Sequence, residues 1–276
     1  MSGPDGVEVV RQELEVDGTT LSCLSAGDPT APPLLLLHGT FWSRVWQPVL
    51  PALGIRHRWV ALDLPGIGRS AGELDVEQAK VPALAAVVAR AADVLGWERF
   101  DLAAHDIGGG IAQHLAATTG RVARMVLMNA VTLDSWPVPA VERFRDPEVR
   151  AATTAADLVE ARRGATRKAV ARQLSDAEVD DYVSPWHDQA RARSWTAMAA
   201  AADARYTQDL VPALVEAAIP TRLVWGRDDV YQKIEYARRY VQTVPGSDLV
   251  EVAGLHIPTE DSAADVARAV LEHLAG

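Results

Sequence analysis

The sequence predicts an α/β protein in which a mostly parallel sheet is flanked by helices and carries an inserted helical segment. Short apolar runs bounded by glycine or proline recur along the chain, and segments of helical periodicity lie between them. A solid apolar run is typical of a strand buried on both faces, and strands that alternate with helices are typical of a parallel sheet. The insertion is indicated by one long segment, 134–206, that contains no convincing buried strand.

The elements follow in order along the chain. Residues 8–14 and 20–25 alternate between apolar and polar side chains around the turn Asp17-Gly18, which predicts two antiparallel strands. The expected buried strands are 34–37, 59–62, 100–104, 125–128, 221–225 and 249–252. The expected helices are 82–95, which has proline near its first position, 110–118 and 263–274.

The segment 134–206 is expected to form a helical cap over one end of the sheet. It is rich in alanine and arginine, and its prolines gather near its start. Residues 1–133 and 207–276 would then form the α/β core. Because open parallel sheets bind ligands outside the carboxyl ends of their strands, a cap in that place would roof the site and exclude water.

Composition and charge narrow the class of protein. Of 276 residues, 49% are hydrophobic and 23% are charged, the usual balance for a soluble globular chain. No apolar stretch reaches the ~20 residues of a membrane-spanning helix, and the first residues do not resemble a secretory signal, so no membrane partner is expected. The single cysteine, Cys23, cannot form an internal disulfide, which favours a reducing, cytoplasmic setting. The net charge of −10 argues against nucleic acid as a partner, and a homo-oligomer is left open.

The strongest chemical signal lies between residues 102 and 110. An apolar strand leads through Ala104 and His105 to Asp106, and glycines and a helical segment follow. This is the layout of a nucleophile elbow, a tight strand-to-helix turn that holds one side chain above the sheet and needs small neighbours. Here Ala104, Gly108 and Gly109 supply the small residues, and Asp106 occupies the place of the nucleophile. A glycine-rich turn capped by an aspartate is the simpler alternative.

Three further motifs favour the elbow. The run H-G-T-F at 38–41 follows a strand, and the N–H of Thr40 could form an oxyanion site with the N–H of Ile107. A W-G-x-x-D motif ends at Asp229 after another strand, and its neighbour Asp228 is expected to cap the following helix. His256 lies just past the last strand. The chain order is therefore nucleophile, acid, histidine.

These four motifs, over roughly 34–134 and 219–274, resemble the α/β-hydrolase superfamily. Within it, the chain resembles the branch with an aspartate nucleophile: epoxide hydrolases and haloalkane or haloacetate dehalogenases. The resemblance implies an α/β-hydrolase fold with an inserted cap and a hydrolase that needs no cofactor and no metal. The glycines at 108–110 do not form a dinucleotide-binding G-x-G-x-x-G motif, and no Walker motif is present in the sequence.

An aspartate in the nucleophile position predicts a particular chemistry. A carboxylate with an ordinary pKa of ~3.9 is ionised at neutral pH and can attack an sp³ carbon that carries a good leaving group. The product is an alkyl ester of Asp106. His256 would then activate the water that hydrolyses this ester, while Asp229 orients the imidazole and Thr40 and Ile107 stabilise the oxyanion.

The chain departs from the typical members of both groups of relatives. Typical haloalkane dehalogenases have tryptophan directly after the nucleophile, where this chain has Ile107; typical epoxide hydrolases use two cap tyrosines, and the residue that matches the second is Trp195. Tyr182 and Tyr206 are the remaining cap phenols. The residues expected to line the substrate pocket are Phe41, Trp42, Tyr182, Trp186, Trp195 and Tyr206.

The leading hypothesis is a hydrolase that opens an epoxide of a small apolar molecule, and dehalogenation is the close alternative. A third hypothesis is a non-hydrolytic cyclase or isomerase of small-molecule biosynthesis on the same scaffold, which the departures at Ile107 and Trp195 keep open. A ligand-binding receptor is a fourth. A receptor has no need of Asp106, Asp229 and His256 together, which argues against it.

Overall fold

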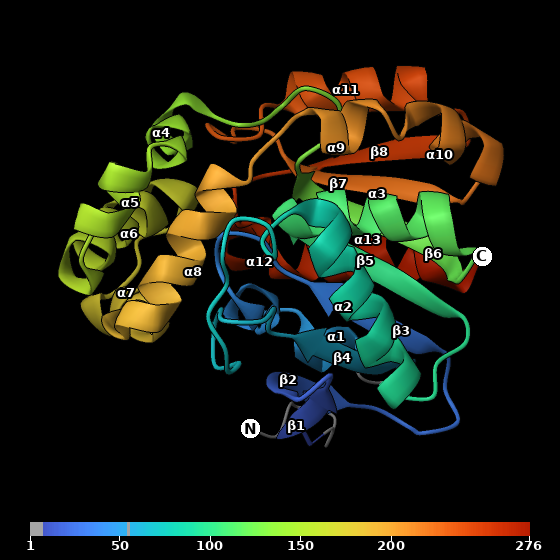
Figure 1. The fold of residues 1–276 in the computed structure, drawn as a ribbon. Helices are drawn as coiled ribbons and strands as arrows, with labels where there is room; N and C mark the ends of the chain where they lie inside the picture. The colour runs from blue at the N-terminus through green and yellow to red at the C-terminus, as the bar shows by residue number, and fades with distance from the viewer. Residues whose placement is uncertain (1–7, 54–55) are drawn as a thin grey trace.

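A computed structural model describes residues 8–53 and 56–276. Its centre is an eight-stranded sheet with the strand order β1-β2-β4-β3-β5-β6-β7-β8, and helices cover both of its faces (Figure 1). β1 pairs with β2, and β2 with β4, in antiparallel fashion, and every later pairing is parallel. The predicted α/β fold with a mostly parallel sheet is therefore confirmed.

The strands are β1 (Val10–Val16), β2 (Thr19–Ala26), β3 (Pro33–Leu37), β4 (Arg58–Leu62), β5 (Phe100–Asp106), β6 (Val122–Ala130), β7 (Thr221–Gly226) and β8 (Ser247–Val252). The α-helices are α1 (Leu50–Leu53), α2 (Val81–Val94), α3 (Ile107–Thr119), α4 (Pro139–Glu142), α5 (Pro147–Ala152), α6 (Ala155–Ala169), α7 (Asp176–Val183), α8 (Gln189–Ala200), α9 (Arg205–Gln208), α10 (Val211–Ala217), α11 (Ile234–Thr243), α12 (Pro258–Asp261) and α13 (Ala263–Ala275). Three short 3-10 helices are η1 (Ser43–Trp46), η2 (Arg143–Arg145) and η3 (Ser184–His187).

Each predicted buried strand lies within an observed strand, but one of them is not buried. The leucines of β3 are inaccessible to solvent, because β3 lies inside the sheet between β4 and β5. β8 was expected to be buried on both faces, yet Val252 is its one buried residue. The reason is position: β8 forms the edge of the sheet and pairs with β7 alone.

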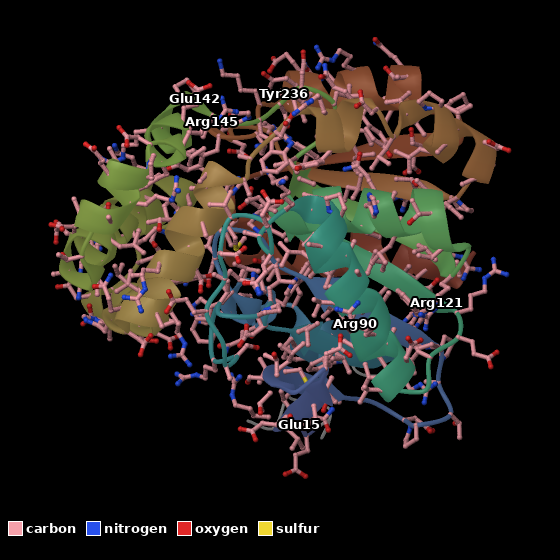
Figure 2. All side chains as sticks on the ribbon, in the orientation of Figure 1. Glu15, Arg90, Arg121, Glu142, Arg145 and Tyr236 are labelled. Carbon is pink, nitrogen blue, oxygen red and sulfur yellow. The ribbon has the colours of Figure 1, made fainter. Side chains whose placement is uncertain are left out.

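The layers on the two faces of the sheet are held by apolar contacts. In Figure 1, α2 and α3 lie in front of the sheet and α13 lies behind it. α3 packs closely on β5 and β6: a Cβ added to Gly109 would overlap that of Ala130. Charged side chains such as Glu15, Arg90 and Glu142 lie at the periphery, in contact with solvent (Figure 2).

The chain between β6 and β7 is largely helical: α4 to α8 form the lobe at the left of Figure 1, and α9 and α10 lie beside α3. α6 and α7 begin at capping boxes, in which Thr154 and Asp157, and then Ser175 and Glu178, exchange side-chain and backbone hydrogen bonds. Local sequence thus determines where these helices start. The division of the chain into a core and an inserted cap at residues 134–206 stays a prediction.

Side chains of this lobe reach the loops that follow β3 and β4. Trp195 Nε1 donates to the carbonyl oxygen of Thr40 at 3.0 Å, and Arg191 Nε donates to that of Gly68 at 2.9 Å. The lobe therefore lies over the carboxyl ends of the central strands, which is where parallel sheets bind ligands. Among the helices that the structure describes, none is long and apolar enough to cross a membrane.

Candidate active site

Asp106 lies at a sharp turn between β5 and α3. Its backbone has φ +55° and ψ −126°, and its side chain does not cap the helix that follows. Residues other than glycine rarely adopt positive φ, and such strain is of the order of 1–3 kcal/mol. A Cβ on Gly108 would lie 2.6 Å from the carbonyl oxygen of His38, which explains why this turn needs glycine. The predicted elbow geometry is therefore present.

The carboxylate of Asp106 is buried and hydrogen-bonded to the loop after β3. Its Oδ2 accepts a bond of 2.8 Å from Thr40 N and one of 2.6 Å from Thr40 Oγ1. Burial raises the pKa of Asp106. The nearby His256 and His105 and the two Thr40 donors lower it by more, so the net shift is downward. The carboxylate is ionised at neutral pH, as the sequence predicted.

Of the two predicted oxyanion donors, Thr40 contacts the carboxylate. Ile107 N lies near the same carboxylate oxygen. A Cβ added to Gly39 would overlap both Ile107 N and Asp106 Oδ2. Among the described residues, Ile107 N makes no hydrogen bond to the Asp106 side chain, so its part in an oxyanion site stays a prediction.

His256 and Asp229 form a buried pair beside Asp106. His256 Nδ1 lies 2.9 Å from Asp229 Oδ2. Burial lowers the pKa of His256, but the charge and hydrogen bond of Asp229 outweigh it, and the net shift is upward from 6.5. Asp229 is itself held by two more donors: Tyr231 N at 2.7 Å to Oδ1 and Asn129 Nδ2 at 2.7 Å to Oδ2. The structure thus brings Asp106, Asp229 and His256 together.

Asp228 does not cap the following helix, contrary to the sequence prediction. α11 begins at Ile234, and the residue at its N-cap is Lys233. Asp228 is exposed. The prediction was wrong because a loop of several residues separates the acidic pair from the helix, so Asp228 lies too early in the chain to reach the helix N-terminus.

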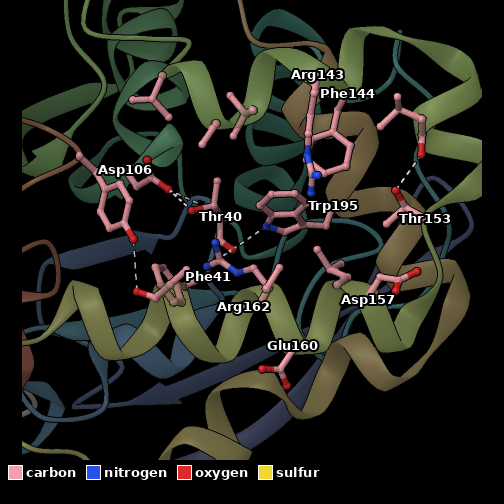
Figure 3. Close-up of a pocket in the computed structure, with 18 of the residues that line it drawn as sticks. Thr40, Phe41, Asp106, Arg143, Phe144, Thr153, Asp157, Glu160, Arg162 and Trp195 are labelled. Atoms are coloured by element: carbon pink, nitrogen blue, oxygen red, sulfur yellow. Dashed lines mark hydrogen bonds between the residues drawn. The ribbon is translucent and has the colours of Figure 1, made fainter.

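A cavity of about 820 Å³ opens next to Asp106 and His256, and residues of the helical lobe line much of it (Figure 3). Its other lining residues are Thr40, Phe41, Val138, Ala140, Val141, Arg143, Phe144, Val149, Ala152, Thr153, Asp157, Leu158, Glu160, Ala161, Arg162, Ala165, Trp195, Tyr231 and Gln232. Most of these side chains are apolar. The cavity lies within the size range of sites that bind drug-sized molecules.

Two of the six predicted pocket residues, Phe41 and Trp195, line this cavity. The other four, Trp42, Tyr182, Trp186 and Tyr206, are not among its described lining residues. Trp42 and Trp186 are wholly buried packing residues. The remaining two are the phenols.

Tyr182 and Tyr206 are the cap phenols that the sequence offered as proton donors. Tyr182 is buried, donates its hydroxyl to Glu260 Oε1 at 2.8 Å and packs edge-on against Phe41. Tyr206 is half-buried in α9, away from the cavity lining. Tyr182 packs inside the lobe and Tyr206 belongs to α9, which contacts α3, so the assignment of both to the pocket is corrected.

Of the lining residues that the sequence analysis missed, Tyr231 and Arg162 lie next to the predicted site residues. The ring of Tyr231 lies 5.2 Å from that of His256, edge to face, and burial raises the pKa of its phenol. Its position two residues after Asp229 could have drawn attention to it. Arg162 of α6 is 7% exposed and donates from Nη2 to the Thr40 carbonyl oxygen at 3.0 Å. It lies in an arginine-rich segment, and nothing in the sequence distinguishes it from its neighbours.

Among residues 8–53 and 56–276, no group of three or more His, Cys, Asp or Glu side chains is placed to hold a metal ion.

The comparison with known families decides the family of this chain. Residues 34–269 match the model of the alpha/beta hydrolase family. The chain belongs to the alpha/beta hydrolase family. The matched residues include the elbow at Asp106, the loop at Thr40 and the Asp229–His256 pair.

Individual members of the family are similar over parts of their length. The chain is 37% identical to Epoxide hydrolase 4 of Mus musculus over 101 residues, which are 36% of this chain and 28% of that protein. It is 34% identical to a fluoroacetate dehalogenase of Burkholderia sp over 110 residues, 38% of this chain and 36% of that protein. The matched stretch thus spans about a third of either relative.

Solved structures of the family share the fold over nearly the whole chain. An alpha/beta hydrolase fold protein from Burkholderia ambifaria superposes with a TM-score of 0.85 at 26% identity, over 95% of this chain and 97% of that one. This likeness confirms the predicted alpha/beta-hydrolase fold, and the family membership confirms the prediction of an enzyme of the hydrolase kind.

Proposed function

We propose that this alpha/beta hydrolase opens an epoxide by attack of the Asp106 carboxylate on an sp³ carbon, followed by hydrolysis of the resulting ester. The observation that carries the proposal is an ionised, buried aspartate at the elbow, beside a histidine that Asp229 orients. Similarity to Epoxide hydrolase 4 supports it. The helical segment 134–206 acts as a cap, because its side chains wall the cavity on the side away from the sheet.

In the first step, one oxygen of Asp106 bonds to the epoxide carbon. Both Thr40 donors bind Oδ2, which leaves Oδ1 as the attacking atom. The carbon–oxygen bond of the ring breaks and leaves an alkoxide, which must receive a proton because it is a strong base. Tyr231 supplies that proton. It is the tyrosine among the described cavity residues, and its raised pKa keeps the phenol protonated.

In the second step, His256 Nε2 takes a proton from a water molecule that attacks Cγ of Asp106. Negative charge develops on Oδ2, where the N–H and hydroxyl of Thr40 already donate. The ester bond breaks, and the proton held by His256 passes to the departing oxygen to give a diol. The carboxylic acid proton left on Asp106 returns to the Tyr231 phenolate, which restores the enzyme.

Tyr231 favours an epoxide over a halide as the leaving group. A halide needs only N–H or O–H donors that never lose a proton, and the indole N–H of Trp195 is already bonded to the Thr40 carbonyl oxygen. An alkoxide needs a donor that gives up its proton, and a phenol beside the catalytic pair can do so.

His256→Gln tests the covalent step, since it removes the base of the second step and leaves the nucleophile intact. Incubation with a panel of aryl and alkyl epoxides should give an enzyme whose intact mass is raised by that of one substrate molecule. Peptide mapping should place the adduct on Asp106. Absence of an adduct on any epoxide that the wild type hydrolyses would contradict the proposal.

Tyr231→Phe serves as the matched test of the leaving group. It should slow ester formation by about a hundredfold while ester hydrolysis stays within a few fold, as rapid-quench kinetics would separate. Two results together would contradict the epoxide proposal and favour dehalogenation: halide release from a haloalkane panel that is insensitive to Tyr231→Phe, and no diol formed from any epoxide.

A further inference from the structure

Arg162 is a buried cation whose hydrogen bonds are incomplete. Its side chain is enclosed by Phe41, Trp186 and Trp195, whose ring centroids lie 4.2, 5.0 and 5.2 Å from its guanidinium carbon. Nη2 donates to the Thr40 carbonyl oxygen, and Nε is buried without a partner. Buried charges in proteins are normally paired with an opposite charge. Among the residues that the structure describes, no carboxylate forms a salt bridge with Arg162.

The guanidinium lies at the wall of the cavity, next to the nucleophile. Thr40 connects the two, because its N–H donates to Asp106 at 2.8 Å while its carbonyl oxygen accepts from Arg162 at 3.0 Å. Figure 3 shows the Arg162 side chain directed toward Thr40 and Trp195. An anionic group of the substrate that binds Arg162 would therefore lie close to the substrate carbon that Asp106 attacks.

We propose that Arg162 binds a carboxylate of the substrate, which makes the preferred substrates epoxides with a carboxylate attached directly to the ring and a larger apolar group on the other ring carbon. The epoxide in this inference rests on the proposed function, whereas the carboxylate rests on the observations at Arg162. A guanidinium offers a planar set of N–H donors that matches the two oxygens of a carboxylate.

Charge balance supports this assignment. A carboxylate brought next to the ionised Asp106 would be repelled, and a fixed cation between the two offsets that repulsion. Ester formation then removes the charge of Asp106, and the substrate carboxylate remains as the counter-charge of Arg162. With a neutral substrate, the opposite charge near the guanidinium at that stage would be the Tyr231 phenolate, and a substrate carboxylate adds a charge that the guanidinium can bind directly.

The size and chemistry of the cavity define the rest of the substrate. A volume of about 820 Å³ is far more than a carboxylate and a three-membered ring occupy. The part of the lining contributed by the lobe includes Val138, Val141, Phe144, Val149 and Leu158, all apolar. We therefore expect an aryl or long alkyl substituent to fill the space on the lobe side.

The first test measures binding alone, so that it does not depend on catalysis. In Asp106→Asn protein, 3-phenylpropanoate should bind at least about tenfold more tightly than 3-phenylpropanamide by calorimetry, because a hydrogen bond to a charged group stabilises more than one between neutral groups. Adding Arg162→Met should abolish this preference. Arg163→Met, at the next position of α6 with its guanidinium on Asp180, should leave the preference unchanged.

Arg162→Lys keeps the inference testable if the methionine variant does not fold. It retains the charge and loses the planar donors, so the preference for the acid should fall several-fold without disappearing. Equal affinity of the acid and the amide in Asp106→Asn protein, or a preference that persists in both Arg162 variants, would overturn the inference.

The second test joins binding to turnover. Wild-type kcat/KM should be at least tenfold higher for 3-phenyloxirane-2-carboxylate than for its carboxamide, and Arg162→Met should reverse or remove this ratio. If neither compound is hydrolysed but the acid still binds preferentially through Arg162, the epoxide chemistry fails and the carboxylate site stands. If both are hydrolysed equally, the carboxylate site fails and the epoxide chemistry stands.

Discussion

In the proposed mechanism, Asp106 carries its charge before any substrate arrives, and this divides the work of the site between two half-reactions. A serine at the same place would need His256 to remove its proton before it could attack. The depressed pKa of Asp106 removes that need, so His256 is free to act on water afterwards. In this mechanism Asp229 has the same task in both half-reactions: it would hold the imidazole in one orientation and stabilise its protonated form.

Asp229→Asn tests that task, and Asp228→Asn is its matched control. The first should lower kcat on the order of a thousandfold, because the amide no longer favours the required tautomer of His256. The second changes an exposed neighbour and should leave kcat within twofold. Steady-state kinetics on one epoxide, with circular dichroism to verify folding, measures both. A larger loss in Asp228→Asn would mean that the acid of the pair is misassigned.

The pH profile separates an orienting role of Asp229 from a merely structural one. His256 acts as a base only when neutral, and Asp229 raises its pKa above 6.5. The rate of ester hydrolysis in the wild type should therefore fall with decreasing pH through a midpoint above 6.5. In Asp229→Asn the residual activity should fall with a midpoint at lower pH, because the carboxylate no longer stabilises the imidazolium. An unshifted midpoint would contradict direct coupling of the two side chains.

For single residues, sequence analysis identified the site residues that belong to motifs and did not identify those that lie outside them. Asp106, Asp229 and His256 each lie at the end of a strand or shortly after it, in a recognisable motif, so their proximity in space could be predicted. Arg162 meets Thr40 across 122 positions of sequence, through a helix whose orientation no local pattern reveals. Tyr182 was misassigned because an aromatic side chain in a helix has the same appearance whether it lines a cavity or packs inside the lobe.

Among the elements, α12 couples the helical lobe to the loop that carries His256. Glu260 Oε1 accepts hydrogen bonds of 2.8 Å from Arg44 Nη1 and from the hydroxyl of Tyr182, and its Oε2 pairs with Arg172. Ile257 N, directly after His256, donates to the carbonyl oxygen at the end of α6. Residues of the lobe and of the core thus share one buried carboxylate, four positions from the base.

Glu260→Gln should destabilise the protein by about 3 kcal/mol, since it leaves the buried Arg44 without its full counter-charge. Glu272→Gln is the matched control, because that side chain is 62% exposed and 3.9 Å from Arg222, so its loss should cost about 0.5 kcal/mol or less. Urea unfolding followed by tryptophan fluorescence compares the two. Equal stability of the two variants would show that α12 does not join lobe and core.

The helices also show what patterns can and cannot predict. The segment 110–118 was expected to be helical from its residues, and α3 starts earlier, at Ile107, because the elbow leads directly into the helix. β8 was read as buried from its apolar run, although strand order along the sheet, which no single run encodes, makes it an edge.

On the scale of the whole molecule, the parallel sheet is what assembles the site. Thr40 follows β3, Asp106 ends β5, and Asp229 and His256 follow β7 and β8, so all four lie at the same edge of the sheet. The helical lobe closes the space above them and supplies Arg162 and Trp195 to the cavity. In the proposed mechanism, the sheet thus positions the reacting groups, and the lobe determines which molecule reaches them.

A single turnover in heavy-oxygen water tests the covalent mechanism most directly. With wild-type enzyme in excess over an epoxide, the first diol formed should contain only ordinary oxygen, and the peptide that contains Asp106 should gain one heavy oxygen. This follows because water attacks Cγ of Asp106 and not the substrate carbon. A diol that carries the heavy oxygen after one turnover, with an unlabelled Asp106 peptide, would contradict the account.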